Sequence, residues 1–470
     1  MSHKPVNFCT LRVGGQSLGA SGRRAMTRTM LAALAALAAS PAAAQDAAPL
    51  LTGSAAFLDW RADAPGVRRK IAPADLPAPY ASEPAASRSE VVARPQGATP
   101  KVPPGFAAEI FAQDLKGPRV LRISPSGDVF VSESNGGRVR GFKLDAAKAG
   151  PTENAIFAEG LDRPYGLAFY PPGPEPTHLY VATETKVLRY PYRAGALASA
   201  GPAETIVDGL PSGGHWTRDI VFSPDGKTLY VAVGSRSNVA EGNPLLPAQE
   251  IEAIEKANGL GASGGPELLR ANVLAFDADG KNRRVFATGL RNCSGMTLRP
   301  GSDDLWCVVN ERDMLGDNLP PDYATHVRHG AFYGWPWRYI GDHIDPRHAG
   351  ERTELAGKAT TPDVLFQAHS APLGISFYEG AQFPAEYKGD AFVALHGSWN
   401  RAKRTGYKIV RLKFSGGAPT GEYEDFLTGF VLDDTHVWGR PVDVAVAPDG
   451  ALLVSEDGNG TIWRVFRDGK

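Results

Sequence analysis

The sequence predicts an all-β protein, a six-bladed β-propeller, and three observations support this prediction. Six segments each place two apolar runs on either side of a turn such as Pro-Asp-Gly. β-Branched and aromatic residues alternate in these runs, and Gly, Pro and Asp supply the backbone angles of tight turns, which is typical of hairpins. The segments recur at roughly fifty-residue spacing, as blades packed in a ring do, because one hairpin cannot bury its own apolar face. The 53 Gly and 38 Pro suit many short strands and turns.

The predicted hairpins follow one another without a missing blade. They begin at Gly117, Arg163, His215, Arg291, Ala371 and Arg440. A lone strand, FAAEIFAQDL from Phe106, precedes them. Such a strand can pair with the last blade and close the ring, which removes exposed strand edges. We therefore expect residues 101–470 to form a propeller closed by its own N-terminal strand.

The first hundred residues predict an export signal followed by an arm. In residues 1–44, three arginines between positions 23 and 28 precede a short apolar run, and small residues follow up to Ala44. This is the pattern of a cleaved signal peptide, so we expect a periplasmic protein. No stretch is long and apolar enough to be a membrane span. Residues 45–100 are rich in Ala and Pro and lack periodicity, which predicts an extended arm on the surface rather than a domain.

Charge and cysteine content narrow the possible partners. With 50 Lys+Arg against 51 Asp+Glu, the chain has no global electrostatic reason to bind nucleic acid or an anionic membrane. Cys9 falls in the predicted signal peptide, while Cys293 and Cys307 lie on the two limbs of one predicted hairpin. An oxidising compartment permits a disulfide between them. Because the expected register places them slightly out of opposition, a disulfide and two buried thiols both remain open.

The residues that begin the inner strands are mainly basic. In a propeller these strand starts line one mouth of the central channel, so residues distant in sequence meet there. A single arginine is most simply explained as a surface ion pair or a brace between blades. Several cations at one mouth favour a polyanionic ligand, and guanidinium forks suit carboxylates. The residues concerned are Arg163, His215, Arg218, Arg291, Asn292 and Arg440.

Five longer motifs resemble one known family. They are GGHWTRDIVFSPDG (213–226), GLRNCSG (289–295), VNERDMLGDNLPPD (309–322), YGWP (333–336) and GRPVDVAVAPDG (439–450). In this order they resemble the glucose/sorbosone dehydrogenase family, and the sorbosone dehydrogenase-like branch in particular. The family consists of soluble quinoproteins that hold pyrroloquinoline quinone (PQQ) on a six-bladed propeller. The resemblance covers roughly residues 102–466.

The resemblance implies catalytic and cofactor-binding roles. His215 stands where the family has its catalytic base, and an imidazole can remove the proton of a sugar hydroxyl during hydride transfer. Arg291 and Asn292 match the pair at the reactive carbonyl of the quinone, where they stabilise developing charge. Arg440 matches an arginine that engages cofactor carboxylates, but Val442 replaces the family's second arginine.

Two further assignments rest on looser matches. The family places a blade-five lysine on the cofactor, for which Arg401 and Lys403 are the candidates here; a solvated basic hairpin tip is the alternative. Family members bind calcium largely through main-chain oxygens, which implies the carbonyls of Arg312 and Asp313, within Asn310–Asp317. Because the family's Gly-Pro is Arg-Asp here, the side chains of Glu311, Asp313 or Asp317 are alternative ligands.

The expected function is PQQ-dependent oxidation of an aldose sugar or a sorbosone-like aldehyde, with calcium as second cofactor and a separate electron acceptor. Two alternatives remain: a calcium-dependent lactonase, which needs carboxylate and amide side chains on one metal, and a non-catalytic periplasmic binding propeller. The substrate pocket is expected from the loops at 241–267 and 341–362, so the sequence does not name the sugar.

Overall fold

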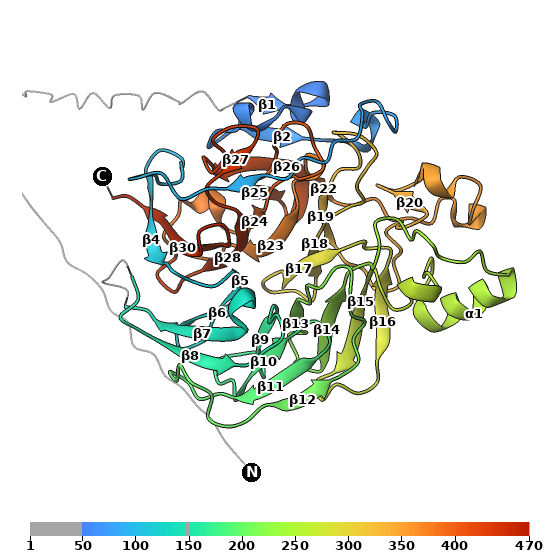
Figure 1. The fold of residues 1–470 in the computed structure, drawn as a ribbon. Helices are drawn as coiled ribbons and strands as arrows, with labels where there is room; N and C mark the ends of the chain where they lie inside the picture. Colours follow the sequence, from blue (N-terminus) through green and yellow to red (C-terminus); the bar gives the residue numbers. More distant parts are fainter. Residues whose placement is uncertain (1–48, 146–149, 470) are drawn as a thin grey trace, which may run out of the picture. The chain divides into compact units, whose positions relative to one another are not determined.

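The computed structural model describes residues 49–145 and 150–469, and the predicted signal peptide, residues 1–44, lies outside them. Strands dominate, and six sheets stand in a ring as the six blades of a β-propeller (Figure 1). The sequence prediction of an all-β, six-bladed fold is confirmed. In the described part of the chain, no helix is long and apolar enough to cross a membrane.

Each blade is an antiparallel sheet whose first strand lies nearest the ring centre. Blade one holds β5 (Pro118–Ile123), β6 (Val129–Glu133), β7 (Arg138–Lys143) and β8 (Glu153–Glu159). Blade two holds β9 (Leu167–Tyr170), β10 (His178–Ala182), β11 (Val187–Pro191) and β12 (Glu204–Val207). Blade three holds β13 (Ile220–Phe222), β14 (Thr228–Val233), β15 (Asn272–Asp277) and β16 (Arg284–Thr288).

The remaining blades follow the same pattern. Blade four holds β17 (Cys293–Leu298), β18 (Leu305–Val309), β19 (Tyr323–His326) and β22 (Val364–Leu365). Blade five holds β23 (Pro372–Phe377), β24 (Ala391–Leu395), β25 (Lys408–Ser415) and β26 (Ala418–Leu427). Blade six holds β28 (Pro441–Val446), β29 (Leu452–Glu456), β30 (Thr461–Arg467) and β4 (Phe106–Ala112). The six predicted hairpins supply the inner two strands of the six blades.

The ring closes through β4, as the lone N-terminal strand predicted. This strand pairs antiparallel with β30, with Phe106 opposite Arg467 and Ala108 opposite Val465. Six apolar clusters lie between successive blades, and one of them joins blade six to blade one through Phe111, Leu453 and Val129. Burial of these faces is the main stabilising contribution, because an isolated blade would leave both faces in water.

The two cysteines form a disulfide, so the question left open by the sequence is answered. Cys293 and Cys307 have Cα atoms 5.8 Å apart. Their strands β17 and β18 pair with a bulge between Cys293 and Gly295, and Cys307 stands opposite Met296. The cysteines are therefore out of direct opposition, as expected, and the irregular register brings them close enough to bond.

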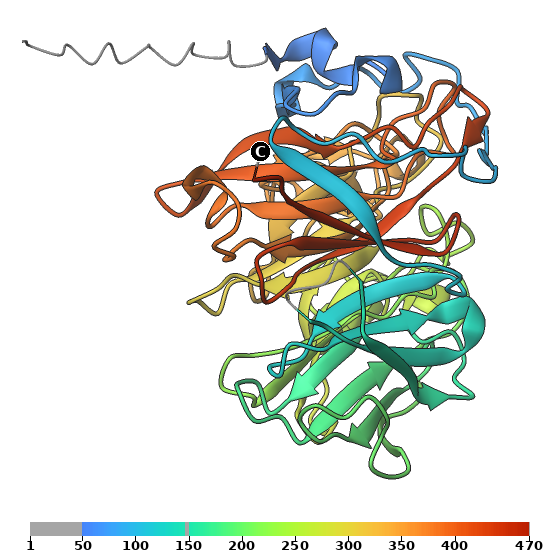
Figure 2. The ribbon, with the colours of Figure 1, turned by 90° about the vertical axis from the view of Figure 1, so that its left-hand side faces the viewer.

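The N-terminal arm is ordered and adds strands to the propeller. It carries β1 (Leu50–Leu51), β2 (Arg68–Lys70) and β3 (Glu90–Val91); β2 extends blade five beyond β26, and β3 pairs parallel with β27 (His436–Val437). Figure 2 shows the arm running alongside the strands of blade five. Arg69 is fully buried between Asp63 (2.8 Å) and Asp425 (2.9 Å), so this segment makes interior contacts that its composition did not predict.

Two long connections lie outside the blades. The one between β14 and β15 contains α1 (Ala248–Asn258), and the one between β19 and β22 contains β20 (Arg338–Tyr339) and β21 (His343–Ile344). An ion pair between Arg352 and Glu255 joins them. Short 3-10 helices occur at Gly53–Phe57, Trp60–Ala62, Pro73–Asp75, Ser134–Gly136, Gly265–Glu267, Pro346–His348, Thr353–Leu355 and Ala385–Tyr387.

Ion pairs of Arg122 with Asp219 and Asp443 join several blades at the central channel, and we call these three residues the collar. Arg122 of β5 bonds to Asp219 before blade three (3.0 Å) and to Asp443 of β28 (3.2 Å). Asp219 also accepts the backbone N–H of Met296 (2.7 Å), so blade four joins the same collar. Blade five packs closely against Asp443 because residue 374 of β23 is glycine. A Cβ at this position would lie 2.1 Å from an Asp443 oxygen. Inner strands from all six blades line a cavity of about 420 Å3, and Arg122 is part of its wall.

Candidate active site at the mouth of the channel

His215 precedes β13 and is held as a neutral base. Its Nδ1 lies 2.8 Å from the carbonyl oxygen of Ser235. A carbonyl oxygen can only accept, so Nδ1 carries the proton and Nε2 keeps its lone pair. Burial, followed by the charge of Arg291, lowers the pKa of His215 to about 3. Among the described residues, nothing forms a hydrogen bond with Nε2, so this atom is available to a ligand.

Asn292 lies next to His215 because residue 234 is glycine. A Cβ on Gly234 would lie 2.3 Å from Asn292 Oδ1 and 2.6 Å from His215 Cβ. Asn292 is buried, and its Oδ1 has no hydrogen-bond partner in the part of the chain that the structure describes. A buried polar atom without a partner is uncommon, and a bound ligand is one way of satisfying it. The structure therefore brings together the predicted base and the predicted amide.

Arg291 organises the loops around the site. Its Nε donates to Asn238 O (2.9 Å), Nη1 to Asn310 O (3.3 Å) and Glu311 O (2.7 Å), and Nη2 to Asn238 Oδ1 (3.0 Å) and Asp313 Oδ2 (3.1 Å). These contacts use all five N–H groups of the guanidinium. Direct bonding to a ligand would require one of them to be given up, whereas the buried positive charge already acts on His215.

Asn238 is a site residue that sequence reasoning missed. Its side-chain oxygen accepts from the backbone N–H of Asp313 (2.7 Å), and its amide donates to the Asp313 carbonyl (3.0 Å). Its own carbonyl accepts from Arg291 and from Trp335 Nε1 (2.9 Å). The residue follows β14 in a loop without a recognisable motif, so its central position is visible only in three dimensions.

Arg440 precedes β28 and shares one carboxylate with two other basic residues. Asp457 bonds to Arg440 Nε (2.9 Å), His396 Nε2 (3.0 Å) and Arg119 Nη1 (2.6 Å). Burial raises the pKa of Asp457, but His396, Arg119 and Arg440 outweigh this effect and hold that pKa below its usual range. Within the described residues Nη1 and Nη2 of Arg440 make no hydrogen bond, and its side chain is one-third exposed (33%). These donors are free for an anion.

Two other predicted mouth residues act as braces. Arg218 is fully buried and donates to the carbonyls of His215 and Thr217 (both 2.8 Å), and burial lowers its pKa to about 9. Arg163 pairs with Glu184 and lies over the Trp216 ring at 5.2 Å. These contacts bring Arg218 to His215 and Arg163 to the neighbouring Trp216, but in a bracing role rather than with donors held out to a ligand.

The two blade-five candidates point elsewhere in this structure. Arg401 is buried and donates to Asp317 O (2.8 Å) and Phe57 O (2.7 Å), which ties the arm to the predicted metal loop. Lys403 is 54% exposed at its side chain and bonds to Asp434 (2.7 Å). Within the described part of the chain, neither contacts His215, Asn292 or Arg440.

The predicted metal loop, Asn310–Asp317, contains a buried carboxylate oxygen without a partner among the described residues. The Asp313 carbonyl already accepts from Asn238 and from Arg312 Nε (3.0 Å), and the Arg312 guanidinium bonds to Asp345 (2.9 Å). Glu311 Oε1 is buried with no partner among the described residues, and burial raises the pKa of Glu311 to about 7. In the described ranges, no group of three or more His, Cys, Asp or Glu side chains has the geometry of a metal cluster.

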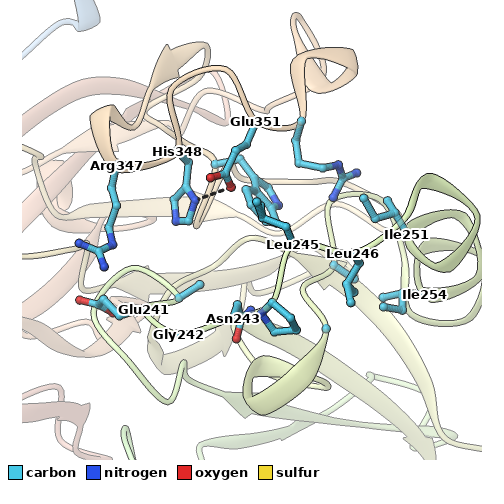
Figure 3. Close-up of a pocket in the computed structure, with 16 residues that line it drawn as sticks. Glu241, Gly242, Asn243, Leu245, Leu246, Ile251, Ile254, Arg347, His348 and Glu351 are labelled. Atoms are coloured by element: carbon cyan, nitrogen blue, oxygen red, sulfur yellow. Dashed lines mark hydrogen bonds and ion pairs between the residues drawn. The ribbon is translucent and has the colours of Figure 1, made fainter.

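A second cavity lies where the substrate pocket was expected. It has a volume of about 540 Å3 and is bounded by the two long connections. Figure 3 shows apolar Leu246, Ile251 and Ile254 on one part of its wall and the hydrogen bond between His348 and Glu351 (2.9 Å) on another. His348 Nε2 also lies 2.8 Å from the carbonyl of Val239, next to Asn238. The cavity wall is thus directly linked to the loop that holds Arg291.

Fold and site define a six-bladed β-propeller with a neutral histidine and free guanidinium donors at one channel mouth. The chain matches the TrAA12-like family over residues 100–327 and 341–468 and therefore belongs to that family. The match confirms the family expected from the sequence, that of the soluble quinoprotein sugar dehydrogenases, while the sorbosone-like branch stays a prediction.

Individual relatives are distant. An uncharacterized protein of Borreliella burgdorferi is 28% identical, covering 78% of this chain and 91% of the relative. The pyrroloquinoline quinone-dependent pyranose dehydrogenase of Coprinopsis cinerea is 23% identical over 77% of this chain, which spans only 54% of that protein. An aldose sugar dehydrogenase of Escherichia coli is 27% identical over 54% of this chain and 61% of its own length.

Solved structures agree on the fold. The PQQ domain of the Coprinopsis cinerea pyranose dehydrogenase, in its holo form, has a TM-score of 0.63 at 22% identity and covers 80% of this chain and 98% of its own. A calcium structure of the AA12 enzyme of Trichoderma reesei has a TM-score of 0.61 at 21% identity, covering 78% and 97%.

Proposed function

We propose that this protein is a PQQ-dependent dehydrogenase that oxidises an aldose sugar or a related aldehyde, with calcium as second cofactor. The names of the pyranose and aldose sugar dehydrogenases among its relatives support this proposal. The observation that carries it is His215, neutral at physiological pH, with Nε2 free beside the buried amide of Asn292. Removal of a hydroxyl proton needs an unprotonated base within reach, and this imidazole nitrogen is one.

The residues present fit the cofactors. Bound PQQ supplies a quinone that accepts the hydride. The free Nη1 and Nη2 donors of Arg440 suit its carboxylates, and the buried amide of Asn292 has an unpartnered oxygen that can accept from a ligand. The unpartnered Glu311 Oε1 offers calcium the hard oxygen that it prefers.

Each residue of the site then has its own role in proton transfer or in stabilising charge. His215 Nε2 takes the proton of the sugar hydroxyl, and the Ser235 carbonyl keeps the imidazole in the required tautomer. Asp313, whose charge favours protonation of His215, stabilises the imidazolium that forms. Arg291 holds Asp313 and Asn238 in place, and its positive charge stabilises the negative charge that develops on the reacting oxygen.

The proposal is tested by reconstituting the purified apoprotein with PQQ and calcium and measuring dye-linked oxidation of an aldose panel. The expected result is a change in the quinone absorption spectrum and turnover that depends on PQQ. Hydrolysis of a lactone without PQQ would instead identify a calcium-dependent lactonase. Binding of PQQ or sugar without turnover of any substrate would identify a binding propeller.

We also propose that the mature protein is periplasmic, because residues 1–44 have the composition of a cleaved signal peptide. Mass spectrometry of the protein from a periplasmic fraction should give a chain beginning at Gln45. A full-length chain confined to the cytoplasmic fraction would contradict the proposal.

A further inference from the structure

The N-terminal arm contributes two residues to a cavity at the channel mouth. The cavity has a volume of about 360 Å3, and its wall combines Arg88 and Ser89 of the arm with His396, Trp399 and Tyr407 of blade five and with Arg440. No acidic side chain lines it. Two guanidinium groups facing one cavity, without a carboxylate on its wall, favour an anionic occupant.

Both guanidinium groups have donors to offer. Arg88 is exposed and lies over the Trp399 ring at 5.7 Å, and it makes no hydrogen bond or ion pair with any residue that the structure describes. The Arg440 guanidinium bonds to Asp457 through Nε alone, so its Nη1 and Nη2 donors remain available to a ligand. The contact with the Trp399 ring uses none of the N–H groups of Arg88, which leaves them for bidentate contact with a carboxylate.

The backbone that presents Arg88 is anchored on both sides. The N–H of Ser87 donates to the Trp399 carbonyl (2.7 Å), and Ser89 Oγ lies 2.9 Å from the Tyr407 hydroxyl. Directly afterwards, β3 pairs with β27. An anchored segment loses little conformational freedom when a ligand binds, so the contact costs less entropy than one from a free chain end.

We infer that Arg88 and Arg440 together bind carboxylates of the quinone cofactor, so that the arm completes the cofactor site. The inference rests on the proposed function. Val442, which stands where a second arginine was expected beside Arg440, is fully buried and apolar, so it offers no donor. Arg88 supplies the second cation from a segment that precedes the family match, which begins at residue 100.

The test is the affinity of the apoprotein for PQQ, measured by titration in the presence of calcium through tryptophan fluorescence. Arg88→Ala should weaken binding about tenfold, because it removes an exposed, charge-assisted contact. The PQQ affinity of Arg88→Lys should lie between those of Arg88→Ala and the wild type, since an ammonium keeps the charge but loses the planar fork. Raised salt should narrow the difference between wild type and Arg88→Ala.

Arg94→Ala is the matched control. Arg94 is another arm arginine that stacks on a tryptophan, Trp463, at 5.5 Å, but it does not line the cavity. This variant should bind PQQ like the wild type. Melting curves of both alanine variants should match that of the wild type, because Arg88 makes no hydrogen bond to a described residue whose loss would destabilise the fold.

Three outcomes would overturn the inference, and they differ from one another. Equal PQQ affinity of wild type and Arg88→Ala would overturn the role of Arg88 and leave the proposed function intact. A raised KM for an acidic sugar, with unchanged PQQ affinity, would show that the cavity binds a substrate carboxylate instead. A wild-type protein that binds no PQQ would refute the proposed function and this inference with it.

Discussion

His215 is the residue on which the proposed chemistry depends most directly. His215→Gln should retain PQQ but lose most sugar oxidation, about a hundredfold in kcat, because glutamine cannot take the hydroxyl proton. Steady-state kinetics at saturating PQQ measure this loss. The amide can still bond to the Ser235 carbonyl, so the fold should be kept, and wild-type turnover in a folded variant would remove His215 from the mechanism.

The low pKa of His215 predicts an unusual pH dependence. With a pKa of about 3, the imidazole remains a base down to about pH 4, so kcat/KM should not show the acid limb near pH 6.5 of an ordinary histidine. The unfolded chain binds this proton more readily, so the contribution of His215 to stability is full above about pH 6.5 and declines as the pH falls toward 3. Kinetics and thermal melts across pH 4 to 8 check both statements, with His215→Gln as the reference that lacks the group.

Alanine variants of Arg440 and Arg291 should lose different properties: the first should lose cofactor affinity and the second turnover. Arg440 has free donors, so Arg440→Ala should weaken PQQ affinity about tenfold and leave turnover at saturating PQQ nearly unchanged. Arg291 has none, and its loss would release Asn238, Glu311 and Asp313 together. Arg291→Ala should therefore lower kcat even at saturating PQQ, and recovery of full turnover by added cofactor would contradict this assignment.

At the level of elements, the loop Asn310–Asp317 is expected to bind the calcium. Chelation should remove activity and lower the melting temperature together, since a ligand of the folded state alone stabilises it by mass action. Restoring calcium with PQQ should recover both. A sample shown by elemental analysis to lack calcium, yet oxidising sugar at full rate with PQQ, would contradict the metal assignment.

The sequence predicted those elements whose signal is local. Each inner hairpin combines alternating apolar residues with a tight turn, so all six were recognised, and β4 was placed in blade six because a ring needs its closing strand. The strands β1, β2 and β3 were missed, because two or three residues carry no periodicity. The partner of β1 is β2, but β2 and β3 pair with β26 and β27, which are hundreds of residues away. Pairing of that kind is decided by the finished surface of the propeller.

The candidate site likewise contains residues that the sequence predicts and residues that only the structure reveals. His215, Asn292 and Arg440 stand in motifs at strand starts, and the structure brings His215 and Asn292 together and leaves Arg440 with unused donors. The tautomer of His215 and the full engagement of Arg291 follow from carbonyl oxygens of loops, which have no sequence signature. Asn238 and Arg88 belong to an irregular loop and to the arm, so only the fold shows what they touch.

At the level of the whole molecule, Arg122 joins blades through the channel collar. Arg122→Met should destabilise the protein by about 3 kcal/mol or more at pH 8, because it leaves the buried carboxylates of Asp219 and Asp443 without their cation. Burial already raises the pKa of Asp443 to about 7, and losing Arg122 raises it further. The folded variant then binds protons more readily than the unfolded chain, so its deficit should shrink as the pH falls to 5. Denaturant melts at both pH values measure the difference, and an equal deficit would contradict the carboxylate explanation.

The collar also bears on how an enzyme of the proposed kind would admit its two reactants. The ion pairs of Arg122 with Asp219 and Asp443 lie among the inner strands, and Arg122 also lines the cavity that these strands form. If these ion pairs close the channel to both reactants, sugar and electron acceptor approach through the same mouth and occupy it in turn. For an enzyme of the proposed kind, this arrangement implies ping-pong kinetics, with parallel double-reciprocal plots and mutual inhibition by each reactant at high concentration.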